Sequence, residues 1–486
     1  MFIDFVLRQT NVKTVAYILL LAIVLCVFNQ FILIGIVTIL CIALLQLKIF
    51  RSDFYSKVIG LIIVGFLTVT SDIGDIVRLG FNVVSIITLF YFFLKHYGLT
   101  ISAYPKLPSW MLYFILLVVF SMSVSTLFST NLVVGFVETS RQILFFFIIY
   151  IIYAFIDSDK TAFLYLNSII IAGTVISIAI IFSFISSDKL FYLLATTGLV
   201  TDAGYFNNQA AAGGILAVSI PLTLTLILSP NKIFIINLNK LKILLILEFI
   251  SILLTNSRAA ISAAIISMII ISFILKRKAF IKLFFRALTI FLGLLLIFPK
   301  LIDLFLTFFR SGSVFENTRY YLWDMAFKMY LDNPIFGIGP GLFQDNMYKH
   351  LPVMLGSWDE TRIRMLDELA GKNNVGIAHN FFISKLSELG VLGILTSVIL
   401  PVIFFYFAIN LIKKMKGTKS KNYSIVVGIY GTGIGLFYRS LFEVTGLLSY
   451  GWITRDLPFW VLMVVLLKLY LTVSAKTAPK IISPIK

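Results

Sequence analysis

The sequence predicts an all-α integral membrane protein, a polytopic bundle of about fourteen transmembrane helices (twelve as the alternative) with one large external helical loop. Hydrophobic residues make up 60% of the chain and charged residues 13%, against about 45 to 50% and about 25% in ordinary soluble domains. Apolar runs long enough to cross a bilayer recur along the chain. Lysines gather in the short segments between alternate runs, as membrane orientation requires.

Composition also excludes several other classes. The formal charge of +18 could indicate nucleic-acid binding, but the lysines lie in short loops between apolar runs and therefore follow the positive-inside rule. Cys26 and Cys41 both fall within apolar runs, which favours packing over a disulfide or a metal site. The first run lacks a small-residue cleavage site, so we interpret it as a membrane anchor.

The elements follow from apolar runs and the polar residues that separate them. Residues 1–299 hold eleven predicted spans: 13–28, 31–48, 58–70, 80–95, 109–127, 143–156, 162–185, 209–228, 243–254, 259–275 and 284–299. Residues 300–380 form the predicted large external loop. Residues 381–486 hold the last three spans, at 391–412, 423–438 and 456–473, so both termini are expected inside the cell.

Three polar features qualify this scheme. Glu138 and Arg141 are placed on an external loop between the spans at 109–127 and 143–156. Arg258 is placed on the external rim, at a tight turn between two helices. Glu248 lies within an apolar span and needs a partner, which the sequence does not name.

Arginine and lysine are distributed unequally. Nine of the thirteen arginines fall on the predicted outer side: Arg78, Arg141, Arg258, Arg310, Arg319, Arg362, Arg364, Arg439 and Arg455. A guanidinium group matches phosphate oxygens in a two-pronged geometry that lysine lacks, so this bias suggests a phosphorylated lipid. For Arg310, Arg362 and Arg364 we favour ordinary solvated charge on a large loop.

The chain has few groups suited to catalysis. Of its three histidines, His96 lies at a predicted cytoplasmic helix end and His350 within the external segment. His379 is the strongest candidate, because it stands beside Asn380 where the polar segment enters an apolar helix. Zinc-binding pairs and phosphate-binding loops with a Gly-Lys-Ser/Thr ending are absent from the sequence. No metal site is therefore predicted, and Gly337-Ile-Gly339-Pro-Gly341 is interpreted as a tight turn.

Four blocks in order give a resemblance to a known family. They are Asn256-Ser257-Arg258-Ala259, Arg319-Tyr-Tyr-Leu-Trp323-Asp-Met-Ala326, Asn333-Pro334 with Gly337, Gly339 and Gly341, and His379-Asn380 with Gly390 and Gly393. Together, over roughly residues 200–415, they resemble the O-antigen ligase and polymerase family. Each block alone is weak, but the ordered set in a many-span chain is more specific.

The resemblance implies a glycosyltransferase of the bacterial cytoplasmic (inner) membrane, with its active site on the periplasmic face. Such an enzyme uses an undecaprenyl-diphosphate-linked glycan as donor and needs neither cofactor nor metal. It implies that Arg258 and Arg319 hold the diphosphate and that His379 acts on the acceptor hydroxyl or helps to position it. Further expected substrate contacts are Asn207, Asn380, Tyr320 and Trp323, the last two with packing as an equal alternative.

The resemblance leaves two activities open. A polymerase joins lipid-linked repeat units, and a ligase passes the finished glycan to lipid A-core; the number of predicted spans favours the polymerase. A polysaccharide flippase is a further alternative, but it would gather polar groups near the bilayer midplane. Expected partners are the lipid-linked oligosaccharide, the acceptor glycan and the bilayer, with contact to a flippase or chain-length regulator and none to nucleic acid. The sequence does not identify the sugar or its linkage.

Overall fold

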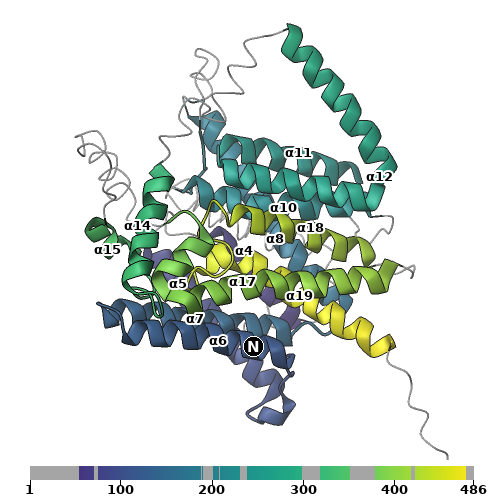
Figure 1. The fold of residues 1–486 in the computed structure, drawn as a ribbon. Helices are drawn as coiled ribbons and strands as arrows, with labels where there is room; N and C mark the ends of the chain where they lie inside the picture. The colour runs from purple at the N-terminus through teal and green to yellow at the C-terminus, as the bar shows by residue number, and fades with distance from the viewer. Residues whose placement is uncertain are drawn as a thin grey trace, which may run out of the picture.

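The computed structural model describes residues 54–69, 75–187, 189, 201–206, 208–229, 238–297, 318–350, 378–416 and 422–477. All regular secondary structure in these segments is helical (Figure 1). The predicted spans at 13–28 and 31–48 lie outside the described residues.

Most helices coincide with predicted spans. They are α4 (Phe54–Thr68), α5 (Asp75–Tyr97), α6 (Ser109–Leu127), α7 (Leu132–Ala154), α8 (Asp159–Ser186), α10 (Gln209–Leu228), α11 (Leu238–Leu254), α12 (Arg258–Ile297), α17 (Phe381–Lys416), α18 (Tyr423–Arg439) and α19 (Ile453–Thr477). The predicted external loop contributes α14 (Thr318–Asp332), α15 (Phe343–Met347) and the 3₁₀ turn η4 (Tyr348–His350), and a second 3₁₀ turn, η2, covers Ile101–Ala103. Within the described segments, eight helices are long and apolar enough to cross a membrane. The all-α, multi-pass prediction is confirmed.

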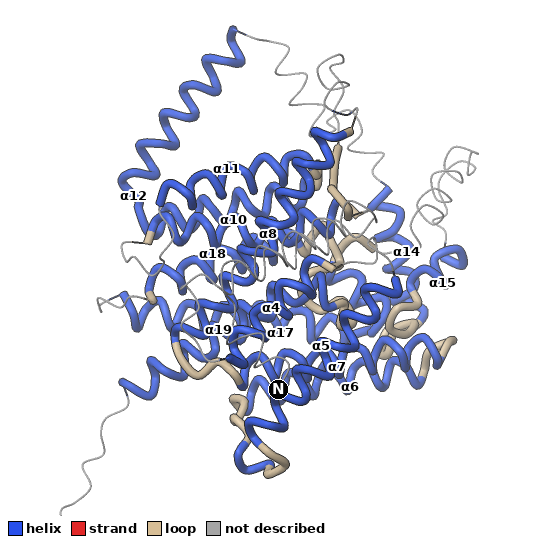
Figure 2. Tube along the Cα trace, turned by 180° about the vertical axis from the view of Figure 1, so that it is seen from behind, coloured by secondary structure: helices blue, strands red, loops and turns tan. Residues whose placement is uncertain are grey.

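The bundle is organised around α19. Side chains from Leu457 to Leu467 are almost all fully buried, including Trp460 and Phe459, as expected of a helix that is apolar on every face and surrounded by others. Figures 1 and 2 show α6 and α7 on one side of the molecule and α10, α11 and α12 on the other, with α17, α18 and α19 between them.

The helix ends sort to two opposite ends of the bundle, as alternating spans require. At one end the hydroxyl of Tyr205 donates to the carbonyl of Thr68 at 2.7 Å, joining two predicted outer segments. At the other end Lys414 Nζ donates to Ser474 Oγ at 2.9 Å, joining two predicted inner segments. We call the first of these the site end, because the candidate functional residues lie there.

Two predicted boundaries are wrong. Helix α7 begins at Leu132, capped by the side chain of Asn131, so Glu138 and Arg141 lie on a helix and not on a loop. Charged residues between apolar runs are typical of a loop, but the helix tolerates these two because Arg141 pairs with Glu138 and its Nε donates to the carbonyl of Tyr450 at 2.6 Å. A partner so distant in the sequence gives no local signal.

The second correction concerns the segment after Arg258. In α12 two helical segments meet at a kink at Lys276, where the backbone is non-helical, so the spans predicted at 259–275 and 284–299 are two helical segments joined without a loop. The basic cluster therefore marks a bend and not a loop. The structure also names the partner of Glu248, since Ser219 Oγ of α10 donates to its carboxylate at 2.5 Å.

Candidate functional site

The glycine-rich turn and the break in α17 form one structure. Gly337, Gly339 and Gly341 all have positive φ, which confirms the predicted tight turn. Helix α17 is interrupted at Gly390, where φ is 64° and ψ is −150°. A Cβ atom on Gly390 would lie 2.4 Å from the carbonyl oxygen of Ile335, so this close approach requires glycine.

Backbone hydrogen bonds hold the turn against the broken helix. The interruption frees the carbonyls of Ser387 and Glu388, which a continuous helix would use. They accept instead from the amides of Ile338 and Gly339, at 3.1 and 3.0 Å, and the amide of Val391 donates to Pro334 at 2.9 Å. The turn is therefore fixed on the start of α17, the helix that His379 immediately precedes.

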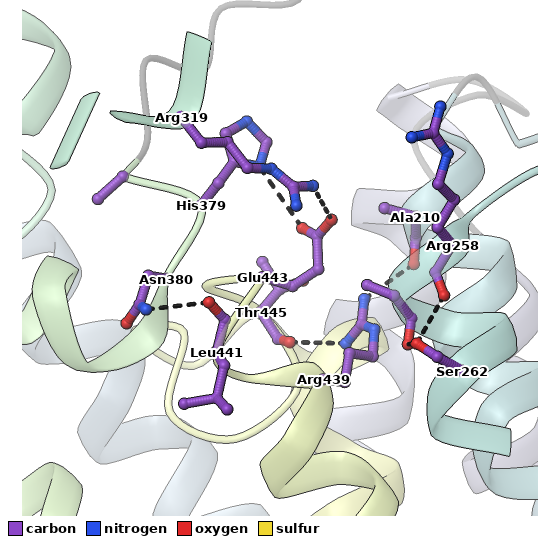
Figure 3. A network of polar contacts seen from close by, with 12 residues as sticks. Ala210, Arg258, Ser262, Arg319, His379, Asn380, Arg439, Leu441, Glu443 and Thr445 are labelled. Atoms are coloured by element: carbon purple, nitrogen blue, oxygen red, sulfur yellow. Dashed lines mark hydrogen bonds and ion pairs between the residues drawn. The ribbon is translucent and has the colours of Figure 1, made fainter. Parts of the chain in front are cut away.

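His379 and Arg319 converge on one carboxylate, that of Glu443 (Figure 3). The distance from Arg319 Nη2 to Glu443 Oε1 is 3.6 Å, and that from His379 Nδ1 to Glu443 Oε2 is 3.7 Å. His379 has a φ of 47°, a left-handed conformation that is uncommon for residues other than glycine and frequent at functional sites. The imidazole and the guanidinium thus come together from α14 and the start of α17.

Glu443 was not among the residues predicted for the site. It lies in the segment 440–452 between α18 and α19, and its side chain is 9% exposed. Burial alone would raise the pKa of its carboxyl group, but His379, Arg439 and Arg319 around it hold that pKa below the ordinary value. The group therefore stays ionised and balances the charge of Arg319. The only local signal was its place beside Arg439 at the end of a span.

Arg439 ties the segment after α18 to α10. Its side chain is almost completely buried. Nη1 donates to the carbonyl of Thr445 at 2.7 Å and Nη2 to that of Ala210 at 3.0 Å. A buried guanidinium needs such partners, and the two it has fix the position of Glu443 relative to the start of α10.

Arg258 lies on the other flank of Arg439. It is the first residue of α12, and the turn before it includes Asn256 with a φ of 51°. The start of α10 packs against Arg439 and against the residue before Arg258. A Cβ atom on Gly213 would touch Ser257, and one on Gly214 would touch the guanidinium of Arg439. Figure 3 shows Arg439 between the Arg319–His379–Glu443 group and the start of α12, where the side chain of Arg258 extends away from Arg439. The structure therefore brings the three predicted catalytic residues to one end of the bundle.

The remaining predicted contacts have these positions. Asn380 caps α17, since its Oδ1 accepts from the amide of Ile383 at 3.1 Å and its Nδ2 donates to the carbonyl of Leu441 at 2.9 Å. Trp323 Nε1 donates to the carbonyl of Ala378 at 2.8 Å, next to His379. Tyr320 is exposed, with its ring edge-on to Trp323. Asn207 lies outside the described residues, and for the other three a role in substrate binding stays a prediction.

The arrangement suits an anionic substrate and a proton transfer. Guanidinium groups held at the margin of an apolar bundle can stabilise negative charge without reorganisation, and an imidazole can accept a proton near neutral pH. In the described part of the chain, no group of three or more His, Cys, Asp or Glu side chains is placed to hold a metal ion.

Comparison with known proteins agrees with the motif resemblance. Residues 243–398 match the family described as O-antigen ligase. The match includes Arg258, Arg319, the glycine-rich turn and His379, and it ends before Arg439 and Glu443. No curated protein matches the chain. The match over residues 243–398 supports the resemblance to the O-antigen ligase and polymerase family, whose members are glycosyltransferase-like enzymes.

Proposed function

We propose that the protein transfers an undecaprenyl-diphosphate-linked glycan to a sugar hydroxyl at the outer face of the bacterial cytoplasmic membrane. The observation that carries this proposal is the convergence of Arg319 and His379 on Glu443, with Arg258 nearby at the same end of the bundle. Arg258 is on α12, Arg319 is on α14 and His379 immediately precedes α17, so these segments supply two cations and one proton acceptor.

In the proposed reaction, an acceptor hydroxyl attacks the anomeric carbon of the donor sugar. A new carbon–oxygen bond forms as the bond from the anomeric carbon to the diphosphate oxygen breaks. The hydroxyl proton passes to His379, and the electron pair leaves with the undecaprenyl diphosphate. Arg258 and Arg319 stabilise the negative charge that develops on this leaving group. Glu443 keeps Arg319 and His379 in position before the donor binds.

We further propose that the acceptor is a second lipid-linked repeat unit, which makes the protein a surface-polysaccharide polymerase. The second candidate is a ligase that transfers the glycan to lipid A-core, and the description of the matched family favours it. A deletion strain distinguishes the two by glycan length on a gel. A single repeat unit on the acceptor identifies a lost polymerase, and unmodified acceptor with long lipid-linked chains identifies a lost ligase.

Alanine variants of Arg258, Arg319 and His379 test the reaction itself. Each should lower transfer by about 10²- to 10³-fold if the lost group acts on the transition state. Arg258→Lys should not restore full activity, because a single ammonium lacks the two-pronged geometry. Asp324→Asn, on an exposed part of α14, is the control and should transfer normally. Normal transfer by all three alanine variants at equal membrane abundance would refute the proposal.

A further inference from the structure

A polar cavity of about 140 Å³ lies at the site end, next to the segment that carries Glu443. Its walls come from the first turns of α7, the glycine-rich turn with α15, the start of α17 and residues 444–455. A single water molecule needs only about 10 to 15 Å³ of such space. The cavity is therefore large enough for a ligand such as one sugar residue.

The ionisable side chains of the cavity wall are balanced in charge. Two are carboxylates, Glu138 and Glu388, and two are guanidinium groups, Arg141 and Arg455. Arg141 is already paired with Glu138 and bonded to the carbonyl of Tyr450. A site for phosphate would need an excess of positive charge, so this balance favours an uncharged ligand.

The rest of the cavity wall consists of hydrogen-bonding side chains and an aromatic ring. Gln344, Ser384 and Thr445 present an amide and two hydroxyls, which can accept hydrogen bonds; the amide and the Thr445 hydroxyl can also donate, whereas the Ser384 hydroxyl donates to Glu388 at 3.2 Å. Trp452 forms an aromatic side of the cavity, with the guanidinium carbons of Arg141 and Arg455 at 5.3 and 4.1 Å from its ring centre. Sugars carry many hydroxyls around a compact ring, and a wall of this composition matches them.

The cavity lies beside the candidate catalytic group. Ser384 is on the first turn of α17, five residues after His379, and Thr445 follows Glu443 by two residues. Arg258 is on α12, and α7, which forms another wall of the cavity, lies on the opposite side of α17 and α18 (Figures 1 and 2). Arg258, which is expected to bind the diphosphate, and the α7 wall of the cavity therefore lie on different sides of the segment that carries Glu443.

We propose that this cavity binds one uncharged sugar residue of the acceptor glycan and orients its hydroxyl towards His379. The assignment of this sugar to the acceptor glycan rests on the proposed transferase function. The binding of an uncharged sugar can be measured without any transfer.

The test uses the full chain in lipid nanodiscs and saturation-transfer NMR. The probes are methyl α-D-glucopyranoside, methyl α-D-galactopyranoside and the methyl glycoside of N-acetylglucosamine, with methyl glucopyranosiduronate and inorganic pyrophosphate as anionic comparisons. At least one neutral glycoside should show saturation transfer, reduced at least fivefold in Glu138→Gln and in Gln344→Ala. The control Asp324→Asn, which removes a carboxylate charge on α14 outside the cavity, should bind as the wild type does.

A second measurement assigns the sugar to the acceptor. With purified lipid-linked repeat units as substrates, the same two variants should raise the KM for the acceptor at least fivefold and leave kcat and the donor KM unchanged. The proposal is overturned if no neutral glycoside binds, if only the anionic probes bind, or if the donor KM rises instead. His379→Ala should keep sugar binding and lose transfer. If His379→Ala transfers normally, the proposed transferase mechanism is refuted. The NMR measurement of sugar binding then decides separately whether the cavity binds a neutral sugar.

Discussion

Replacing Glu443 by glutamine tests whether this carboxylate positions the catalytic groups. The substitution keeps the shape of the side chain and removes the charge that faces Arg319 and His379 at 3.6 and 3.7 Å. We expect kcat for glycan transfer to fall about tenfold. The KM for the donor should stay the same or fall, because a negative charge is removed near an anionic substrate.

The magnitude follows from the separation of the charges. At 3.6 Å, two opposite charges attract by about 4 to 5 kcal/mol at an effective dielectric constant of 20. The side chain of Arg319 is 31% exposed, so solvent screening reduces the usable interaction to about 1 kcal/mol. A loss of about 1.4 kcal/mol in orienting Arg319 and His379 together corresponds to a tenfold change in rate.

The assay is transfer at saturating donor in nanodiscs, with the thermal midpoint Tm recorded over pH. The pKa of the Glu443 carboxyl is lowered in the folded protein, so its ionisation stabilises the fold above the unfolded value and this contribution is lost as pH falls through the lowered pKa. The Tm difference between wild type and Glu443→Gln should be constant above about pH 5 and shrink below it. An unchanged kcat, or a Tm difference that grows towards acid pH, would refute the reasoning.

Three further predictions concern the support of the site and its metal requirement. Gly337→Ala should lower the free energy of unfolding by about 3 kcal/mol or more, because the new Cβ atom would lie 2.4 Å from the backbone of Glu388. The control is Gly98→Ala, at nearly the same φ but in open space, which should lower the free energy of unfolding by about 1 kcal/mol. Tyr450→Phe removes the hydroxyl that donates to buried Glu388 and should cost about 1 to 3 kcal/mol in thermal or denaturant unfolding, whereas exposed Tyr406→Phe should be neutral. Chelation with EDTA should leave transfer unchanged, and loss of activity that added Mg²⁺ restores would contradict metal independence.

The sequence was sufficient for the fold class and for the residues that carry the family motifs. Apolar runs predict spans because no other backbone structure except a closed barrel satisfies its hydrogen bonds in lipid. The alternation of lysine-rich and lysine-poor segments then placed Arg258, Arg319 and His379 at one end. Figure 3 shows these three residues in one view, and their roles in catalysis stay predictions.

The sequence could not supply the contacts that depend on distant partners. Glu443 lies beyond α18, and nothing local marks it as the residue that faces His379. The start of α7 was missed for a related reason: Arg141 and Glu138 look like loop residues until the carbonyl of Tyr450 is brought to them by folding. Hydrophobic periodicity and charge predict the local structure of one segment. Ion pairs between segments depend on how the whole bundle folds, so the sequence of one segment does not predict them.

The distribution of charge at the site end explains why such distant contacts are needed. The guanidinium groups of Arg319 and Arg439 both act on the carboxylate of Glu443, and two cations around one group repel each other in an apolar surrounding. Glu443 and the carbonyls of Thr445 and Ala210 hold these two guanidinium groups in place. A diphosphate brings negative charge to the same place, so on the proposed mechanism its binding offsets a repulsion that the folded protein already contains. The segment 440–452 would then act as the support that keeps the cations together until the donor arrives, which is why the residue that governs this support is a carboxylate outside the matched family region.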